Sequence, residues 1–114
     1  MPLFMTQVSY NERAWQALVA NPQSRLDALR PVLEKLGGRI VNGWMAFGDY
    51  DLVLISELPD NASAAAIAIA ASAGGACKTV KTTALMDAAE GAEALRKAAT
   101  CGYRAPTSER TASA

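Results

Sequence analysis

The chain has 114 residues, 51% of them hydrophobic, and its eleven basic side chains balance its eleven acidic ones. This length suits one domain with its own core. The neutral balance gives no basic surface of the kind that binds nucleic acid or an anionic membrane, and no apolar run approaches the roughly 20 residues of a membrane span. Because the N-terminus also lacks the charged and apolar regions of a signal peptide, we expect a cytoplasmic protein.

The absence of histidine restricts the chemistry that the chain can perform. The sequence contains no His, so it lacks the commonest general base near neutral pH and the commonest transition-metal ligand. Cys77 and Cys101 are too far apart for a zinc motif and too few for a disulfide framework. We therefore expect no metal and no cofactor, and acid–base catalysis would have to use carboxylates, tyrosine, lysine or water.

The first part of the chain predicts one strand followed by two helical segments. Leu3–Tyr10 is rich in β-branched and aromatic residues, and alternation places Phe4, Thr6, Val8 and Tyr10 on one face. A helical turn can open at Asn11, and a second helix is capped by Ser24. Since Pro31 removes a backbone donor, we expect this second helix to kink there or to restart near Arg30.

The remainder predicts three strands and two helices. Gly43 lies within the second strand, which indicates a bulge or the close approach of another group. The helix that follows the third strand is mostly alanine, so its propensity is high and its bulk is low. The expected strands are 39–47, 51–57 and Cys77–Leu85, and the expected helices are 62–73 and 87–99.

The element order predicts an α+β fold. The order β-α-β-β-α-β is that of a ferredoxin-like sandwich with a four-stranded antiparallel sheet, here followed by a C-terminal helix. We expect residues 1–90 to form this domain, residues 91–102 to form a helical extension, and residues 103–114 to form a flexible tail.

One face of the predicted sheet needs a cover. Helices cover one face in this topology, yet Leu52, Val53, Leu54 and Ile55 make the third strand apolar on both sides. Leaving the second face in water would expose a large apolar patch. A second copy of the chain or the C-terminal helix is expected to cover it, so we expect a homodimer or a higher homo-oligomer through the sheet face.

The unusual side chains gather around the turn within residues 43–54. Gly48 and Asp49 suit a tight turn, and turn chemistry alone accounts for both. Tyr50 and Asp51 could offer a donor and a charged acceptor at the mouth of a cleft, or could simply hold backbone groups.

The aromatic residues near this turn also allow two interpretations. Trp44 and Phe47, with Tyr10 from the first strand, could line an apolar pocket or belong to a dimer interface, where aromatic residues are enriched. The candidate ligand-binding residues are Tyr10, Trp44, Phe47, Asp49, Tyr50 and Asp51.

The run Phe47-Gly48-Asp49-Tyr50-Asp51 resembles the motif of the GYD-domain family of small prokaryotic proteins. The similarity extends in order over about residues 3–90. It implies a ferredoxin-like fold similar to that of the dimeric α/β barrel superfamily, whose members pair their sheets. The family carries no assigned activity, so the resemblance leaves the chemistry open.

Three functions are compatible with this sequence. The first is a homo-oligomeric module that binds or senses a small apolar ligand in a cleft on the open sheet face. The second is a structural oligomeric subunit with no ligand. The third is a cofactor-free isomerase or monooxygenase, which would rely on Tyr10, Tyr50, Asp49 or Asp51 for proton transfer, so whether the chain is an enzyme stays open.

Overall fold

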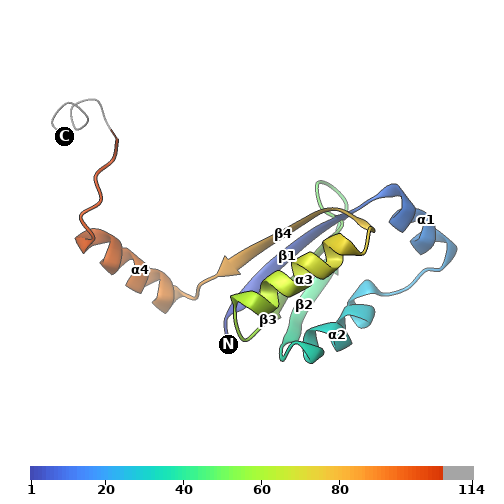
Figure 1. The fold of residues 1–114 in the computed structure, drawn as a ribbon, viewed down its shortest axis with the longest axis horizontal. Helices are drawn as coiled ribbons and strands as arrows, with labels where there is room; N and C mark the ends of the chain where they lie inside the picture. Colours follow the sequence, from blue (N-terminus) through green and yellow to red (C-terminus); the bar gives the residue numbers. More distant parts are fainter. Residues whose placement is uncertain (107–114) are drawn as a thin grey trace.

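The computed structural model of the chain describes residues 1–106, and the greater part of the predicted tail lies outside them (Figure 1). This part of the chain contains four strands and four helices. In order, they are β1 (Leu3–Tyr10), α1 (Glu12–Ala20), α2 (Arg25–Lys35), β2 (Arg39–Met45), β3 (Leu52–Glu57), α3 (Asn61–Ala73), β4 (Cys77–Leu85) and α4 (Ala88–Thr100).

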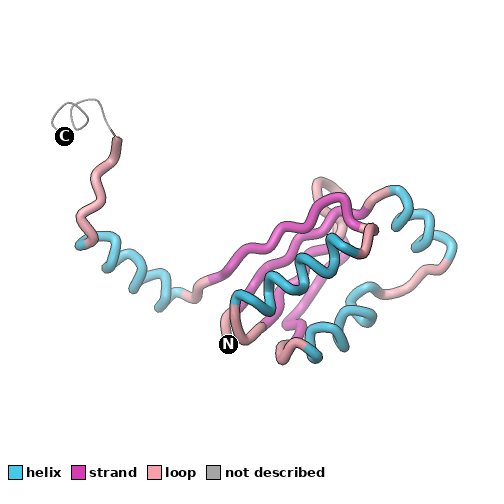
Figure 2. The backbone as a smooth tube through the Cα atoms, viewed as in Figure 1, coloured by secondary structure: helices cyan, strands magenta, loops and turns pink. Residues whose placement is uncertain are grey.

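The strands form one antiparallel sheet in the order β2-β3-β1-β4. Helices α2 and α3 lie over one face of this sheet, and α1 lies beyond its end (Figure 2). The predicted ferredoxin-like arrangement is thereby confirmed. The first and last strands in the sequence, β1 and β4, have the predicted bounds Leu3–Tyr10 and Cys77–Leu85. Strands β2 and β3 are shorter than expected because the loop between them is longer.

The predicted restart of the second helix near Arg30 is wrong. Helix α2 runs unbroken from Arg25 to Lys35 with Pro31 inside it, so the helix does not restart near Arg30. Pro31 is exposed, while Leu33 on the same helix is fully buried in the core. Packing of this helix on the sheet outweighs the loss of a single backbone hydrogen bond at Pro31.

The core lies between the helices and the sheet. One cluster joins side chains of β1, β2, α2 and α3, and a second, smaller cluster lies toward the other end of the central strands. The first consists of Phe4, Leu33, Ile40, Leu58, Ala64 and Ile67, and the second of Val8, Leu52 and Leu54.

Two glycines allow neighbouring segments to approach closely. A Cβ at Gly43 would lie 2.5 Å from Cδ2 of Leu26, which confirms the predicted close approach, here between β2 and helix α2. A Cβ at Gly38 would collide with the backbone carbonyl of Glu57. The register of β2 on β3 also shifts between Ile40 and Asn42.

Asp51 joins the loop between β2 and β3 to the end of β1. Its Oδ2 accepts a hydrogen bond from the backbone N–H of Tyr10 at 2.9 Å. Its own N–H donates to the carbonyl of Val8 at 2.8 Å, and its carbonyl accepts from the N–H of Ala46 at 2.8 Å. Asp51 therefore joins the two ends of this loop to each other and to the end of β1.

The face of the sheet opposite the helices, called the open face below, carries apolar side chains. The registers Met5↔Ile55 and Trp44↔Val53 place these residues together on this face. Trp44 is 51% exposed, and Leu3 on the same face is also exposed. Among the described residues, no helix covers this face (Figure 1).

Helix α4 extends away from the body of the protein (Figure 1). The chain has a radius of gyration of 18.8 Å, against about 13 Å for a compact domain of roughly 100 residues. A capping box at Asp87 starts α4, in agreement with the helix predicted over residues 87–99. Leu95 is exposed, and no residue of α4 is buried. Of the two expected covers for the open face, the chain's own C-terminal helix therefore does not provide it.

Replacing Gly38 by alanine should destabilise the fold, because the new Cβ meets backbone that cannot move aside. We expect Gly38→Ala to lower the free energy of unfolding by about 1–3 kcal/mol, as measured by urea denaturation. Gly91→Ala is the matched control, since a Cβ at this helical position meets nothing within 4 Å. An unchanged midpoint for Gly38→Ala would contradict the packing described here.

Removing the Asp51 carboxylate should leave the backbone N–H of Tyr10 without its acceptor. We expect Asp51→Ala to cost about 1–3 kcal/mol of unfolding free energy. Asp49→Ala, in the same loop but exposed, should stay within about 0.5 kcal/mol of the wild type. If chemical denaturation gave equal stabilities for the two variants, Asp51 would not be the structural anchor of this loop.

Candidate functional site

The structure places the predicted turn residues mostly in the open. Phe47 is 99% exposed, and Asp49 is exposed beside it in the loop. Trp44 lies on the open face, while Tyr50 and Asp51 are partly buried. These side chains do not line either of the two hollows described below.

Tyr10 is the one predicted site residue that lines both hollows. Its backbone is held by Asp51, so these two members of the predicted set do come together. Its ring makes an edge-to-face contact with the Trp15 ring, at a centroid distance of 5.5 Å and an interplanar angle of 85°. Burial raises the pKa of the Tyr10 phenol, while the neighbouring Arg25 opposes this rise. The phenol is therefore a hydrogen-bond donor at neutral pH.

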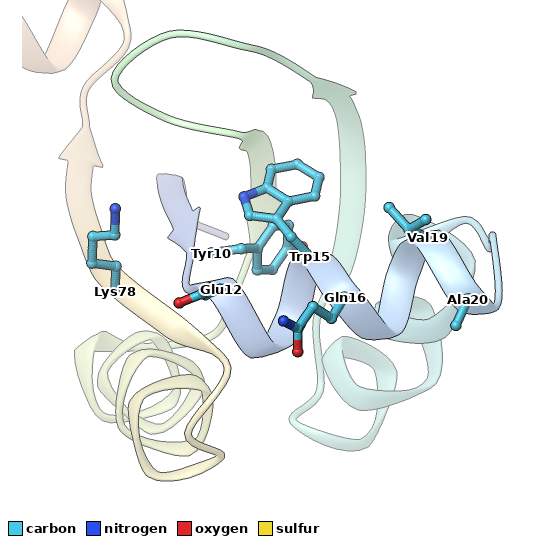
Figure 3. A pocket seen from close by; sticks show the side chains of 7 residues that line it. All are labelled: Tyr10, Glu12, Trp15, Gln16, Val19, Ala20 and Lys78. Carbon is cyan, nitrogen blue, oxygen red and sulfur yellow. The ribbon is translucent and has the colours of Figure 1, made fainter.

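The first hollow is an open depression on the outer side of α1 (Figure 3). The Trp15 side chain lies over the Tyr10 ring, with Glu12 and Lys78 to one side and Val19 toward the far end of the helix. Its volume is about 700 Å³, but it is shallow and wide. A surface of this shape would bury only part of a small molecule.

The second hollow, called the helix-side cavity below, is more enclosed. It has a volume of about 450 Å³ and lies between the helical layer and the sheet, opposite the open face. Strands β1 and β3 contribute Val8 and Leu52 to it, and helices α1, α2 and α3 contribute most of the remaining lining. The lining consists of Val8, Tyr10, Ala14, Ala17, Leu18, Gln23, Arg25, Leu29, Val32, Leu52, Ile67, Ala70, Ala71, Gly74, Ala76 and Cys77.

Small residues explain why this cavity exists. At its N-terminal end α3 packs into the core through the buried Ala64 and Ile67. Toward its C-terminal end it presents Ala70 and Ala71 to the cavity, and these side chains are too short to reach α1 and α2. The alanine content that makes α3 a good helix therefore also leaves space beside it.

The polar groups of the cavity gather at one end. Arg25 begins helix α2 and is partly buried, and its Nη1 donates to Oε1 of Gln23 at 3.2 Å. Its influence on Tyr10 and on Cys77 shows that these groups lie near one another. We call Gln23, Arg25, Tyr10 and Cys77 the polar end of the cavity.

Cys77 is not activated as a nucleophile. Burial raises the pKa of its thiol, and the positive charge of Arg25 opposes this only in part. Since the thiolate is the reactive form, the Cys77 side chain acts as a partly buried neutral group in the cavity wall. The second cysteine, Cys101, is exposed and free.

The arrangement suits binding better than catalysis. It combines an apolar space with one cation, one phenol and one amide, which can orient a ligand. Residues 1–106 contain no cluster of three or more side chains able to hold a metal ion. The helices of this part of the chain also include none with the length and hydropathy required to cross a membrane.

The sequence-based prediction missed Arg25, Gln23 and Cys77. It did not single out Arg25 or Gln23, and it considered Cys77 only for a zinc motif or a disulfide, because none of these residues occurs in a recognisable motif. The alanine-rich composition of α3 was the signal that could have indicated a cavity, since low bulk on one helix leaves space unless a neighbour fills it.

Comparison with known proteins identifies one family. The model of the GYD domain matches residues 4–95, which includes all of the sheet except Leu3, helices α1 to α3 and the first part of α4. No curated protein and no solved structure matches the chain significantly. Because the match covers most of the sequence and agrees with the fold, the chain belongs to the GYD-domain family.

Proposed function

We propose that this protein is a homo-oligomeric module that binds or senses a small molecule, and that the ligand occupies the helix-side cavity. The observation that carries this proposal is the cavity itself. Its volume of about 450 Å³ falls within the range of roughly 300–1,000 Å³ for ligand pockets, and its wall is apolar with a few polar groups at one end.

The location of the ligand differs from the cleft on the open face that the sequence suggested. The open face is a sheet surface bearing Met5, Val53 and Ile55, whereas the helix-side cavity is a half-open concave space bordered by three helices and the sheet. A concave site buries more of a small ligand than a flat one does. The proposal therefore assigns ligand binding to the helix side and assembly to the open face.

Helix α1 gives the cavity a part that can respond to a ligand. No residue of α1 is buried, and its Leu18, Ala14 and Ala17 line the cavity. Its ring contact between Trp15 and Tyr10 is at the edge of the site. A ligand in the cavity would add apolar contacts to the few that α1 makes with the rest of the protein, which is a means of sensing through local order.

Assembly through the open face is supported by the exposed apolar side chains there. Trp44 and Leu3 are exposed, and the neighbouring Met5, Val53 and Ile55 are only partly covered. A stable interface buries about 800 Å² per partner, an area that one face of a four-stranded sheet can supply. The exposed helix α4 offers further surface to a second copy.

A neutral aromatic probe tests the cavity. We expect 1-naphthaleneacetamide to bind the wild type and to shift the backbone amide signals of residues that line the helix-side cavity in two-dimensional NMR spectra. Ala71→Leu places a larger side chain in the cavity wall and should weaken binding by about tenfold or more, which is about 1.4 kcal/mol.

Ala65→Leu is the matched control for this experiment. Ala65 lies on the same helix but is exposed and does not line the cavity, so the substitution should leave the affinity unchanged. Shifts confined to the open face, or equal affinities for the two leucine variants, would contradict the proposed location of the ligand.

A charge on the open face tests the assembly. We expect the wild type to be an oligomer in native mass spectrometry at micromolar concentration, and Ile55→Lys to convert it to monomers because a buried lysine at an apolar interface is unfavourable. Ile69→Lys, on the exposed side of α3, should leave the oligomer intact. A monomeric wild type, or an oligomer that tolerates Ile55→Lys, would assign the open face another role.

A further inference from the structure

We propose that the helix-side cavity selects small amphipathic carboxylates, with the apolar body of the ligand in the cavity and its carboxylate on the guanidinium of Arg25. This inference rests on the proposed function, since it names the chemical class that the same cavity would take.

The guanidinium of Arg25 is the positive charge in the cavity wall. Its side chain lines the cavity and is partly buried. None of the ion pairs among residues 1–106 includes Arg25. These pairs join Asp27 to Arg30, Glu57 to Arg39, and Glu93 to Arg96. A partly buried cation with no carboxylate partner attracts an anion more strongly than an exposed one, because screening by water is weaker there.

A hydrogen bond to Gln23 orients the guanidinium of Arg25. The side-chain carbonyl of Gln23 accepts a hydrogen bond from Nη1 of Arg25 at 3.2 Å, which positions the guanidinium at the polar end of the cavity. A phenol is protonated at neutral pH, and burial raises the pKa of Tyr10 further, so Tyr10 adds an O–H donor beside the cation. At the polar end of the cavity, Arg25 and Tyr10 therefore both present hydrogen-bond donors, as a site for an anion requires. The Gln23 carbonyl is an acceptor, and the Cys77 thiol is only weakly polar.

The single guanidinium and the apolar lining restrict the charge and the size of the ligand. The planar fork of one guanidinium matches one carboxylate in a bidentate arrangement. Leu18, Leu29 and Val32 around the remaining space require an apolar body, and a strongly hydrated dianion would lose its water there without compensation. The combination favours a monocarboxylate attached to an aromatic or aliphatic group.

A matched pair of probes tests this inference. 1-Naphthaleneacetate and 1-naphthaleneacetamide have nearly the same shape and differ in charge. By NMR titration, we expect the wild type to bind the acetate about tenfold more tightly than the amide. Arg25→Gln should abolish this preference, because it should weaken binding of the charged acetate about tenfold more than binding of the amide, whose carbonyl loses only a neutral hydrogen bond.

Two further variants serve as controls. Arg25→Lys keeps the charge but not the planar fork, so we expect it to retain part of the preference for the acetate. Arg30→Gln, on the same helix but exposed and paired with Asp27, should retain the full preference. Circular dichroism and the NMR spectra establish that each variant is folded.

The outcomes separate this inference from the proposed function. If the wild type binds the amide but shows no preference for the acetate, or if Arg25→Gln weakens both compounds equally, the selection of carboxylates is wrong and the cavity remains a binding site. If neither compound shifts the signals of the cavity residues at millimolar concentration, the proposed function itself is wrong and this inference falls with it.

Discussion

The hydrogen bonds of Asp51 fix the point at which the sheet, the loop between β2 and β3 and the helical layer meet. The carboxylate holds the backbone of Tyr10, and the main chain of Asp51 holds Val8 and Ala46. Val8 and Tyr10 are then the residues through which β1 enters the cavity wall. A shift at this end of β1 would move the phenol, its contact with Trp15 and the polar end of the cavity together, so the geometry of the site depends on a loop residue that does not line it.

Most of the fold could be predicted because its elements carry local signals. Alternation in Leu3–Tyr10 indicates the two faces of β1. The N-caps of α1, α2 and α3 are short polar residues of the types that favour this position, namely Asn11, Ser24 and Asp60. These signals depend on neighbours within a few residues, which is the range that a sequence displays directly. The prediction that α2 restarts near Arg30 was wrong because the continuity of α2 depends on tertiary packing of Leu33, which no local pattern reports.

The site was less predictable than the fold. The aromatic residues near Gly48 drew attention because they are unusual, yet Phe47 is almost fully exposed, and rarity of a residue type does not determine its position. The cavity arises from what several elements fail to fill: the alanines of α1 and α3 and the short reach of the side chains opposite them. An absence of volume summed over three helices has no signature in any single segment, so Arg25 and Gln23 became visible only once α2 was placed beside the sheet.

The two proposed activities use opposite faces of one sheet, and this separation follows from the pleat. Adjacent residues of β3 point in opposite directions, so Leu52 faces the helix-side cavity while Val53 lies on the open face. Side chains on the two faces do not touch, although they share one backbone. Substitutions at one face therefore act on binding or on assembly with little direct effect on the other. Any coupling between ligand binding and assembly has to pass through the backbone of β1 and β3. The hydrogen bonds of Asp51 hold this backbone, because they join the residue before β3 to the end of β1.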